Sequence, residues 1–212
     1  FFTVQGYILT LLEGKLKDRK VIQKYLQKAS NASDRLGYII KDIDLITEFE
    51  TGVTKLKIEK FDLCKLIIDL IDSFEIKMKQ KGIEITHEFG NYKSIFVNAD
   101  KFRITQVMSN LIVNSLNYGV ENGTIEITTK NLSKEKLLVR VIDNGQGIPE
   151  DDLPRIFERF YRVDKTRNRQ EGGSGLGLAI VKHIVEAHNE IVYVESSLNV
   201  GSEFSFTLTK SN

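Results

Sequence analysis

The chain has 212 residues, 41% of them hydrophobic, so it is long enough to bury one or two cores. Thirty basic and 29 acidic residues give a formal charge of +1 with no basic stripe, which excludes bulk nucleic-acid binding. No apolar run approaches the ~20 residues that cross a bilayer, and no signal peptide is recognisable, so this stretch is expected to be soluble.

The single cysteine and the first residue carry two further expectations. Cys64 lies in an apolar helical pattern, which favours a buried thiol over a nucleophile or a metal ligand. One cysteine cannot form an internal disulfide, and a reducing compartment fits this. The sequence starts at Phe1 rather than at methionine, as expected of a piece of a longer protein.

Two helices are predicted in the first quarter of the chain. Residues 1–12 are apolar with helical spacing and stop at Gly14, and residues 19–50 carry a second, longer helical pattern. Its apolar residues recur at alternating steps of three and four, as in a coiled-coil seam. These seam positions are Ile22, Tyr25, Ala29, Ala32, Leu36, Ile39, Ile43 and Ile46.

A helix of that length, roughly 45 Å at 1.5 Å per residue, cannot bury its own apolar stripe. We therefore expect a helical hairpin that pairs with a second copy in a four-helix bundle. The alternative is a long helix that folds back on its own domain, because alanine at two seam positions is permissive.

A linker is predicted at residues 51–54, and an α/β domain begins near residue 56. A short strand at 57–61 precedes a helix at about 62–81, for which Gly82 is a plausible C-terminal cap. Alternating apolar residues predict strands at 83–89 and 94–97.

The next helix, residues 101–118, has two different faces. Asp100 can cap it, and six apolar residues face the core. The opposite face carries a polar stripe with three asparagines, which is unusual because asparagine is a mediocre helix former. The asparagine carbonyl oxygen suits a hard cation that already carries phosphates, whereas the alternative is a merely solvated face. The stripe consists of Arg103, Gln106, Asn110, Asn114 and Asn117; the core face consists of Ile104, Val107, Met108, Leu111, Ile112 and Leu116.

A hairpin of strands at 124–130 and 136–142 delivers Asp143 into a turn that contains Gly145 and Gly147. A carboxylate fixed at a strand end can accept hydrogen bonds from a small polar ring, and the glycines let the backbone approach a ligand closely. This outlines a nucleotide pocket. Taken alone, Asp-Asn-Gly is equally the chemistry of a structural turn.

A short helix at 151–157 leads into a long polar loop rich in arginine and lysine, a type that is usually functional or disordered. A glycine-rich segment, 173–178, then opens a helix at 179–188. Free amides and the helix dipole make such a helix start an anion site. Strands at 191–196 and 203–209 close the chain, joined by a turn containing Gly201.

Four motifs now stand in order: Asn-Leu-Ile-Val-Asn at 110–114, Asp-Asn-Gly-Gln-Gly at 143–147, Phe-Glu-Arg-Phe-Tyr at 157–161 and Gly-Ser-Gly-Leu-Gly-Leu at 173–178. Together they resemble the asparagine, first glycine, phenylalanine and second glycine boxes of sensor histidine kinases, within the GHKL ATPase superfamily. The resemblance covers about residues 56–210, and Gly-Ser-Glu-Phe-Ser-Phe at 201–206 is similar to the closing strand motif of that family.

The resemblance implies an α+β fold, a two-layer α/β sandwich of GHKL (Bergerat) type in which a mixed sheet packs on helices. This ATP-binding catalytic domain would span 56–212. Residues 1–52 would be part of the dimerisation and phosphotransfer hairpin that forms a four-helix bundle. The implied partners are a second copy and the receiver domain of a response regulator. The implied location is the cytoplasm, with any membrane attachment made by segments outside this sequence.

The resemblance also implies roles for single residues toward ATP and Mg²⁺. Asp143 would bind the adenine amino group, Asn114 would hold Mg²⁺ with help from Asn110, and Tyr118, Arg162 and Arg167 would contact the phosphates. Phe157 and Phe160 would anchor the lid, and the second glycine box would form its hinge. The assigned positions are Asn110, Asn114, Asn117, Tyr118, Asp143, Gly145, Gly147, Ile148, Phe157, Phe160, Tyr161, Arg162, Arg167, Gly173, Ser174, Gly175, Leu176, Gly177 and Leu178.

The sequence departs from the family pattern at two points. Asn117 stands where these kinases commonly carry a lysine, so one phosphate-contacting charge is missing. The family's phosphoacceptor histidine is absent from this stretch, which is therefore not expected to autophosphorylate. His87 precedes Glu88 and mimics the acceptor pair, but it sits in a strand-like alternation; His183 and His188 are expected to be structural or solvated.

Three functions follow from these patterns. The first is a two-component histidine kinase that transfers the γ-phosphoryl of ATP to a histidine and then to a response-regulator aspartate. The second is a GHKL ATPase, but such enzymes place a glutamate four residues before the metal asparagine, and Asn110 stands there. The third is a non-enzymatic nucleotide-sensing module, suggested by Asn117 and the missing acceptor.

Overall fold

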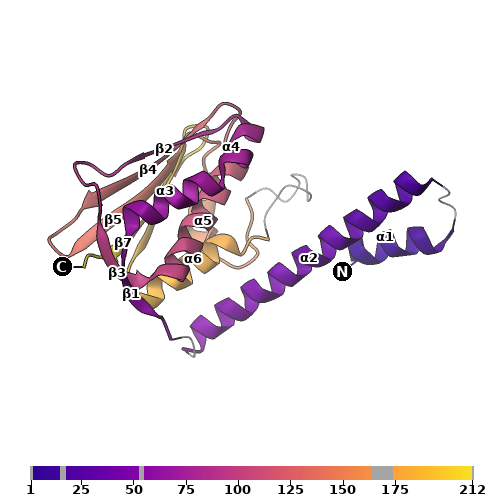
Figure 1. Cartoon of the computed structure of the whole chain (residues 1–212), viewed down its shortest axis with the longest axis horizontal. Helices are drawn as coiled ribbons and strands as arrows, with labels where there is room; N and C mark the ends of the chain where they lie inside the picture. The colour runs from indigo at the N-terminus through magenta and orange to yellow at the C-terminus, as the bar shows by residue number, and fades with distance from the viewer. Residues whose placement is uncertain (1, 15–17, 53–54, 164–173, 212) are drawn as a thin grey trace. The chain divides into compact units, whose positions relative to one another are not determined.

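The computed structural model describes residues 2–14, 18–52, 55–163 and 174–211 (Figure 1). The chain divides into two compact units, Phe1–Thr47 and Glu48–Asn212.

The first unit consists of two helices, α1 (Phe2–Leu12) and α2 (Arg19–Glu50). The last three residues of α2, from Glu48, are counted with the second unit. The rings of Tyr7 and Tyr25 meet edge to face at 5.8 Å, and Lys28 Nζ lies 5.7 Å from the centre of the Tyr7 ring. The two predicted helices are confirmed, and they contact each other at this aromatic pair.

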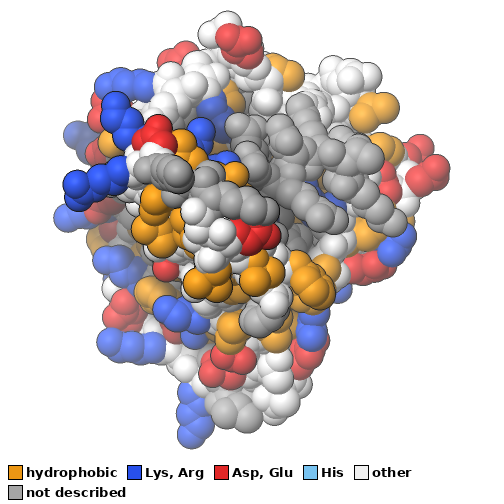
Figure 2. Space-filling model, turned by 90° about the vertical axis from the view of Figure 1, so that its right-hand side faces the viewer, with side chains coloured by type: hydrophobic (Ala, Val, Ile, Leu, Met, Phe, Trp, Pro, Cys, Tyr) orange, Lys and Arg blue, Asp and Glu red, His pale blue; other side chains and the backbone are white. Residues whose placement is uncertain are grey.

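The hairpin leaves much of its apolar surface open. None of the eight predicted seam residues is fully exposed, but only Ala29 and Ile46 are buried. Leu9 and Leu12 on α1 are 52% and 75% exposed, and Leu26 on α2 is 55% exposed. Figure 2, which views the molecule from the right-hand side of Figure 1, shows hydrophobic side chains gathered at the surface between charged ones.

The second unit is a mixed sheet with helices on one face (Figure 1). The five-stranded sheet has the order β2-β4-β5-β7-β6; β2 pairs parallel with β4, and the other neighbours are antiparallel. A second sheet pairs β1 with β3 antiparallel. The strands are β1 (Ile58–Asp62), β2 (Glu84–Glu88), β3 (Phe96–Asp100), β4 (Thr124–Asn131), β5 (Lys136–Asp143), β6 (Val192–Ser197) and β7 (Gly201–Thr209). The helices are α3 (Leu63–Ser73), α4 (Glu75–Lys81), α5 (Lys101–Tyr118), the 3₁₀ helix η1 (Glu150–Arg155) and α6 (Gly177–Ala187).

The predicted helix at 62–81 is wrong in one respect, since it breaks at Phe74 into α3 and α4. Asp62 caps α3 by accepting from the amide of Cys64 at 3.0 Å, and Gly82 ends α4 with a left-handed φ of 64°. The apolar stripe stops at the break: Phe74 is 6% exposed, whereas α4 buries no residue and exposes Ile76 by 72%. Because α4 has no buried apolar face, tertiary packing does not stabilise it as a continuation of α3.

Two other predicted elements shift. The strand expected at 94–97 lies instead at Phe96–Asp100, because β3 pairs with β1 along this whole length in spite of its polar residues. The short helix expected at 151–157 is a 3₁₀ helix over Glu150–Arg155, and Pro154 within it lacks the amide that an α-helix would need. Cys64 is buried, as predicted, and burial raises the pKa of its thiol.

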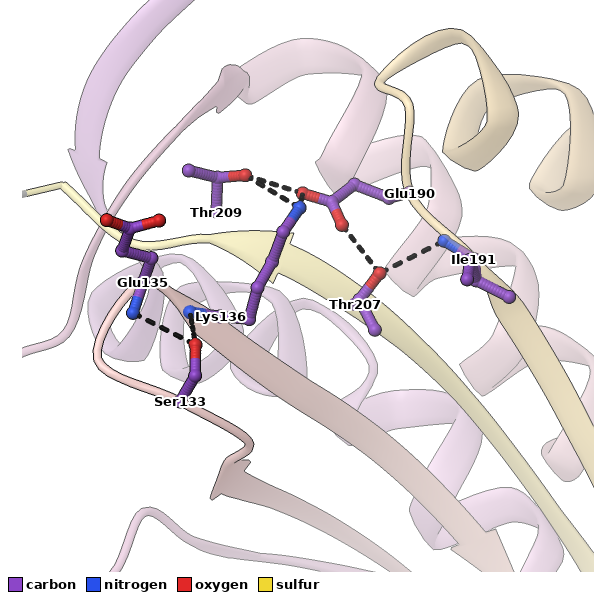
Figure 3. Close-up of polar contacts among 7 residues, drawn as sticks. All are labelled: Ser133, Glu135, Lys136, Glu190, Ile191, Thr207 and Thr209. Carbon is purple, nitrogen blue, oxygen red and sulfur yellow. Dashed lines mark hydrogen bonds and ion pairs between the residues drawn. The ribbon is translucent and has the colours of Figure 1, made fainter.

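A buried carboxylate fastens the start of β5 to the ends of β7 and α6 (Figure 3). Glu190 is 6% exposed, and its Oε1 accepts from Lys136 Nζ at 2.6 Å and from Thr209 Oγ1 at 2.7 Å. Its Oε2 accepts from Thr207 Oγ1 at 2.6 Å, and that hydroxyl accepts from the Ile191 amide at 3.0 Å. Both oxygens are thus satisfied, as a buried charge requires.

Candidate functional site

Helix α5 separates its two faces as the sequence predicts. Asp100 Oδ1 accepts from the Arg103 amide at 3.0 Å and caps the helix. The apolar face is sealed, because its six predicted core residues are at most 2% exposed. Asn110, Asn114 and Asn117 are all half-buried. The helix is therefore held rigidly by its core face while its asparagines remain accessible.

Asp143 ends β5 and is 7% exposed. Its Oδ2 accepts from Ser115 Oγ at 2.9 Å and its Oδ1 accepts from the Gly145 amide at 3.0 Å. Burial raises the pKa of the Asp143 carboxyl, while hydrogen bonds from Ser115 and from the amides of Gly145 and Ser202 oppose that rise. Each carboxylate oxygen has a second lone-pair site, so the group can still accept from a ligand.

The turn after Asp143 lies against the end of α5 and against the β6–β7 turn. The Gln146 amide donates to the Tyr118 carbonyl at 3.2 Å. Gly147 has a φ of 68°, and a Cβ there would lie 2.0 Å from the Ser197 carbonyl oxygen, so no other residue fits without moving the backbone. The asparagine and first glycine boxes are therefore neighbours in space.

The phenylalanine box joins the second glycine box through its backbone. The Phe160 amide donates to the Gly175 carbonyl at 2.9 Å, and a Cβ on Gly175 would lie 2.9 Å from Phe160 Cα. Phe160 has a φ of 62° and is 56% exposed as a residue, and the contacts of this junction are made by its backbone. Phe157 is half-buried, and Tyr161 donates its hydroxyl to Asp152.

The second glycine box in turn reaches the asparagine box. Asn110 Nδ2 donates to the Gly177 carbonyl at 3.3 Å, where α6 begins beside α5. Leu176 is fully buried and fixes the start of α6 in the core. These three contacts bring α5, the turn after Asp143, the phenylalanine box and the second glycine box together in one candidate site. One of them joins Asn110 and Gly177, which are 67 residues apart in sequence.

The chemistry of the asparagines suits a hard cation held together with phosphates. The side-chain amides of Asn114 and Asn117 have no hydrogen-bond partner among the described residues, so their carbonyl oxygens are free to act as ligands. Within the same residues no cluster of three or more histidine, cysteine or carboxylate side chains could hold a metal alone. A cation here would thus have to share its coordination with a ligand such as a phosphate chain.

The arginine-rich loop is only partly described. Arg162 is half-buried, and its Nε has no hydrogen-bond partner among the described residues. Arg167 and Gly173 lie outside the described residues. The other assigned positions of this part, Ser174 and Leu178, are half-buried, as is Ile148 near the first glycine box.

The three histidines differ in their surroundings. His188 is structural: its Nε2 accepts from the Asp100 amide at 3.0 Å, and its Nδ1 lies 2.8 Å from the Ile184 carbonyl oxygen. His87 is exposed on β2 and stacks on Phe89 at 4.8 Å. His183 is half-buried, and burial lowers its pKa.

Ser115 was not among the predicted site residues. Its position on the apolar face of α5, four residues after Leu111 and three after Ile112, was the available signal, because a serine there has to find a buried partner. That partner, Asp143, lies 28 residues away, and only the fold brings the two together.

A mixed sheet that carries a buried aspartate at a strand end, an asparagine-lined helix and a glycine-rich helix start defines a nucleotide-binding α+β domain. Residues 99–212 match the family described as histidine kinase-, DNA gyrase B-, and HSP90-like ATPase. The match covers more than half of the chain, which therefore belongs to this family.

Curated relatives and a solved structure agree with this family. The chain is 32% identical over 207 residues to the sensor histidine kinase WalK of Bacillus subtilis, covering 97% of this chain and 34% of that protein. It is 33% identical to the sensor protein kinase WalK of Staphylococcus aureus, covering 97% and 49%. Thus it spans a third to a half of their length. The histidine kinase ThkA, solved in complex with the response regulator protein TrrA, superposes with a TM-score of 0.75 at 28% identity, covering 98% of this chain and 57% of that chain.

These comparisons confirm the predicted resemblance to sensor histidine kinases and the predicted mixed-sheet fold class. Of the three functions that the sequence left open, they favour the histidine kinase. Among the described residues, no helix is long and apolar enough to cross a membrane.

Proposed function

We propose that this chain is the ATP-binding part of a two-component histidine kinase, with residues 56–212 as the catalytic domain and residues 1–52 as part of the dimerisation hairpin. The observation that carries the proposal is the continuity of the four motifs, through the bonds Gln146–Tyr118, Asn110–Gly177 and Phe160–Gly175. Phosphoryl transfer depends chiefly on the positioning of the reacting groups and on neutralisation of the phosphate charge. A site formed by these four segments would provide both.

In this proposal Asp143 binds the adenine ring through a hydrogen bond. Its ionised carboxylate accepts from the exocyclic amino group, and its burial excludes competing water. Gly145 and Gly147 let the turn after Asp143 pack closely, because a Cβ would lie 2.7 Å from the Tyr118 carbonyl oxygen at Gly145 and 2.0 Å from the Ser197 carbonyl oxygen at Gly147. Ile148, which is half-buried, offers an apolar wall.

The phosphate chain would lie between α5 and the start of α6. The free amides at the glycine-rich start of α6 and its dipole attract negative charge, and Arg162 adds a cation with an unpaired Nε. Asn114 and Asn110 would hold Mg²⁺, which supplies charge neutralisation for the phosphates when bound. Tyr118 and Arg167 are proposed as further phosphate contacts, and Phe157, Tyr161, Ser174 and Leu178 as the frame of the lid.

Hydrolysis by this site is disfavoured by the surroundings of Asn110. Its Nδ2 donates to the Gly177 carbonyl, and an amide has no basic pKa with which to activate water. The γ-phosphoryl group would instead go to a histidine on a helical bundle, and from there to an aspartate of a response regulator. The relative ThkA, whose structure is a complex with a response regulator, supports that partner class.

The open apolar surface of α1 and α2 supports a homodimer. Exposed Leu9, Leu12 and Leu26, together with a half-buried seam, are what a two-helix hairpin presents before a second copy completes a four-helix bundle. We propose a cytoplasmic location for this part of the protein, with any membrane attachment outside this sequence.

Calorimetric titration of the chain with ATP, with and without Mg²⁺, tests the nucleotide site. Asp143→Asn should weaken ATP binding at least tenfold, because the amide presents a donor where the purine needs an acceptor. Asp69→Asn, an exposed change on α3, is the matched control and should leave the affinity unchanged. Equal affinities for wild type and Asp143→Asn would contradict the assigned pocket.

A further inference from the structure

Ser115 makes a polar contact with Asp143 from a helix face that is otherwise apolar. Ser115 is fully buried on the core face of α5, between Leu111 and Leu116, which are also buried. Its Oγ lies 2.9 Å from Asp143 Oδ2 and donates to it. A serine in a helix can instead donate to the backbone carbonyl four residues earlier. Ser115 donates to the Asp143 side chain, so its hydroxyl links α5 to the end of β5.

The carboxylate of Asp143 accepts from three elements: the turn, α5 and, through the Ser202 amide, β7. The amide of Gly145 fixes Oδ1 at 3.0 Å from within the turn, and Ser115 fixes Oδ2 from α5. The terminal torsion of an aspartate is otherwise broad, and Ser115 is the donor that holds the carboxylate plane from the side of α5. Together the donors leave one orientation, in which the remaining lone pairs point in fixed directions.

Ser115 also acts on the charge of the carboxylate. Burial raises the pKa of Asp143, and the hydroxyl of Ser115 opposes that rise by donating to the ionised form. A protonated Asp143 would present a donor to the ring where it now presents an acceptor.

We infer that Ser115 is a positioning residue for purine selection: it holds the Asp143 carboxylate in the orientation that accepts from a 6-amino group, and so favours adenine over purines that lack this group. This inference rests on the proposed nucleotide site. It adds that discrimination among purines depends on a hydroxyl of α5, which contacts Asp143 rather than the nucleotide.

The test compares ATP with purine riboside triphosphate, which has hydrogen in place of the 6-amino group. Ser115→Ala should weaken ATP binding about five- to tenfold, the effect of one ordinary hydrogen bond, and leave purine riboside triphosphate within twofold of wild type. Ser115→Thr, which keeps the hydroxyl, should retain the preference for ATP. Ser109→Ala, on the same helix and with no side-chain hydrogen bond among the described residues, is the control.

A double-mutant cycle with Asp143→Asn separates positioning from packing. In the Asp143→Asn background, Ser115→Ala should change the ratio of the two affinities by less than twofold, because no carboxylate remains to be oriented. An equal loss for both nucleotides in the single mutant, or no loss, would overturn the inference. If the wild-type chain binds neither nucleotide, the proposed nucleotide site itself is wrong.

Discussion

Glu190→Gln removes the buried charge of Figure 3 with little change of shape. The glutamine side chain has one acceptor oxygen and one NH₂ group, whereas Lys136, Thr207 and Thr209 present three donors to the carboxylate. At least one donor therefore faces the NH₂ group and loses its partner. Because the side chain of Glu190 is 3% exposed, water cannot replace that bond.

The magnitude follows from the exposure of the partners. Breaking a buried ion pair costs about 3–5 kcal/mol, but the Lys136 side chain is 41% exposed and regains hydration, which lowers the expected loss. We expect Glu190→Gln to destabilise the fold by about 2 kcal/mol and Glu190→Ala by about 3 kcal/mol. For a unit of this size, 2 kcal/mol lowers the Tm by about 4–8 °C.

The pH dependence has a definite sign. Burial raises the pKa of Glu190, but the hydrogen bonds from Lys136, Thr207 and Thr209 outweigh burial and leave the pKa below its ordinary value of 4.5. A carboxyl whose folded pKa is lowered stabilises the fold above the unfolded pKa and loses this contribution as the pH falls through the folded pKa. The Tm difference between wild type and Glu190→Gln should therefore shrink below about pH 4.

Thermal unfolding by circular dichroism measures the change, and Glu84→Gln, an exposed change on β2, is the control. Lys136 and Asp143 stand at opposite ends of β5, about 23 Å apart along an extended strand. ATP affinity at a temperature where the variant is folded should stay within twofold of wild type. A Tm no lower than that of Glu84→Gln, or a tenfold loss of ATP affinity, would refute this reasoning.

Four further outcomes are expected. Gly147→Ala should destabilise the fold by about 2 kcal/mol or more, while Gly90→Ala, with a similar φ of 62° but open space around it, should cost about 1 kcal/mol; urea unfolding compares them. In calorimetry Mg²⁺ should tighten the binding of ATP to the wild type, whereas it should change the ATP affinity of Asn114→Ala by less than twofold. Leu36→Lys should shift the chain from dimer to monomer in light scattering, and an unchanged mass would contradict the proposed seam. Buried Cys64 should react with a thiol reagent only upon unfolding.

Local patterns predicted the elements that carry the site. The spacing of apolar and polar residues in α5 fixed which side faces the core, and six core positions proved buried. The Asp100 cap and the β4–β5 hairpin were likewise predicted from neighbouring residues. The order of the four motifs along the chain predicted the family, which the family match confirms.

Contacts between distant residues could not be predicted. The Ser115–Asp143 bond spans 28 residues, and the Lys136–Glu190 pair spans 54, so no local periodicity records either of them. The break at Phe74 was missed because the apolar stripe of α3 runs straight to it, and only the exposure of α4 shows that the stripe ends there.

Phosphoryl transfer tests the central claim most directly. The chain would be incubated with Mg²⁺ and γ-labelled ATP together with a separately supplied helical bundle that carries an acceptor histidine. We predict an acid-labile label on the histidine of the bundle, lost when the chain carries Asn114→Ala or Asp143→Asn. A chain that binds ATP in calorimetry but never labels the bundle would contradict the kinase and favour a nucleotide-sensing module, and rapid release of free phosphate by the chain alone would favour an ATPase.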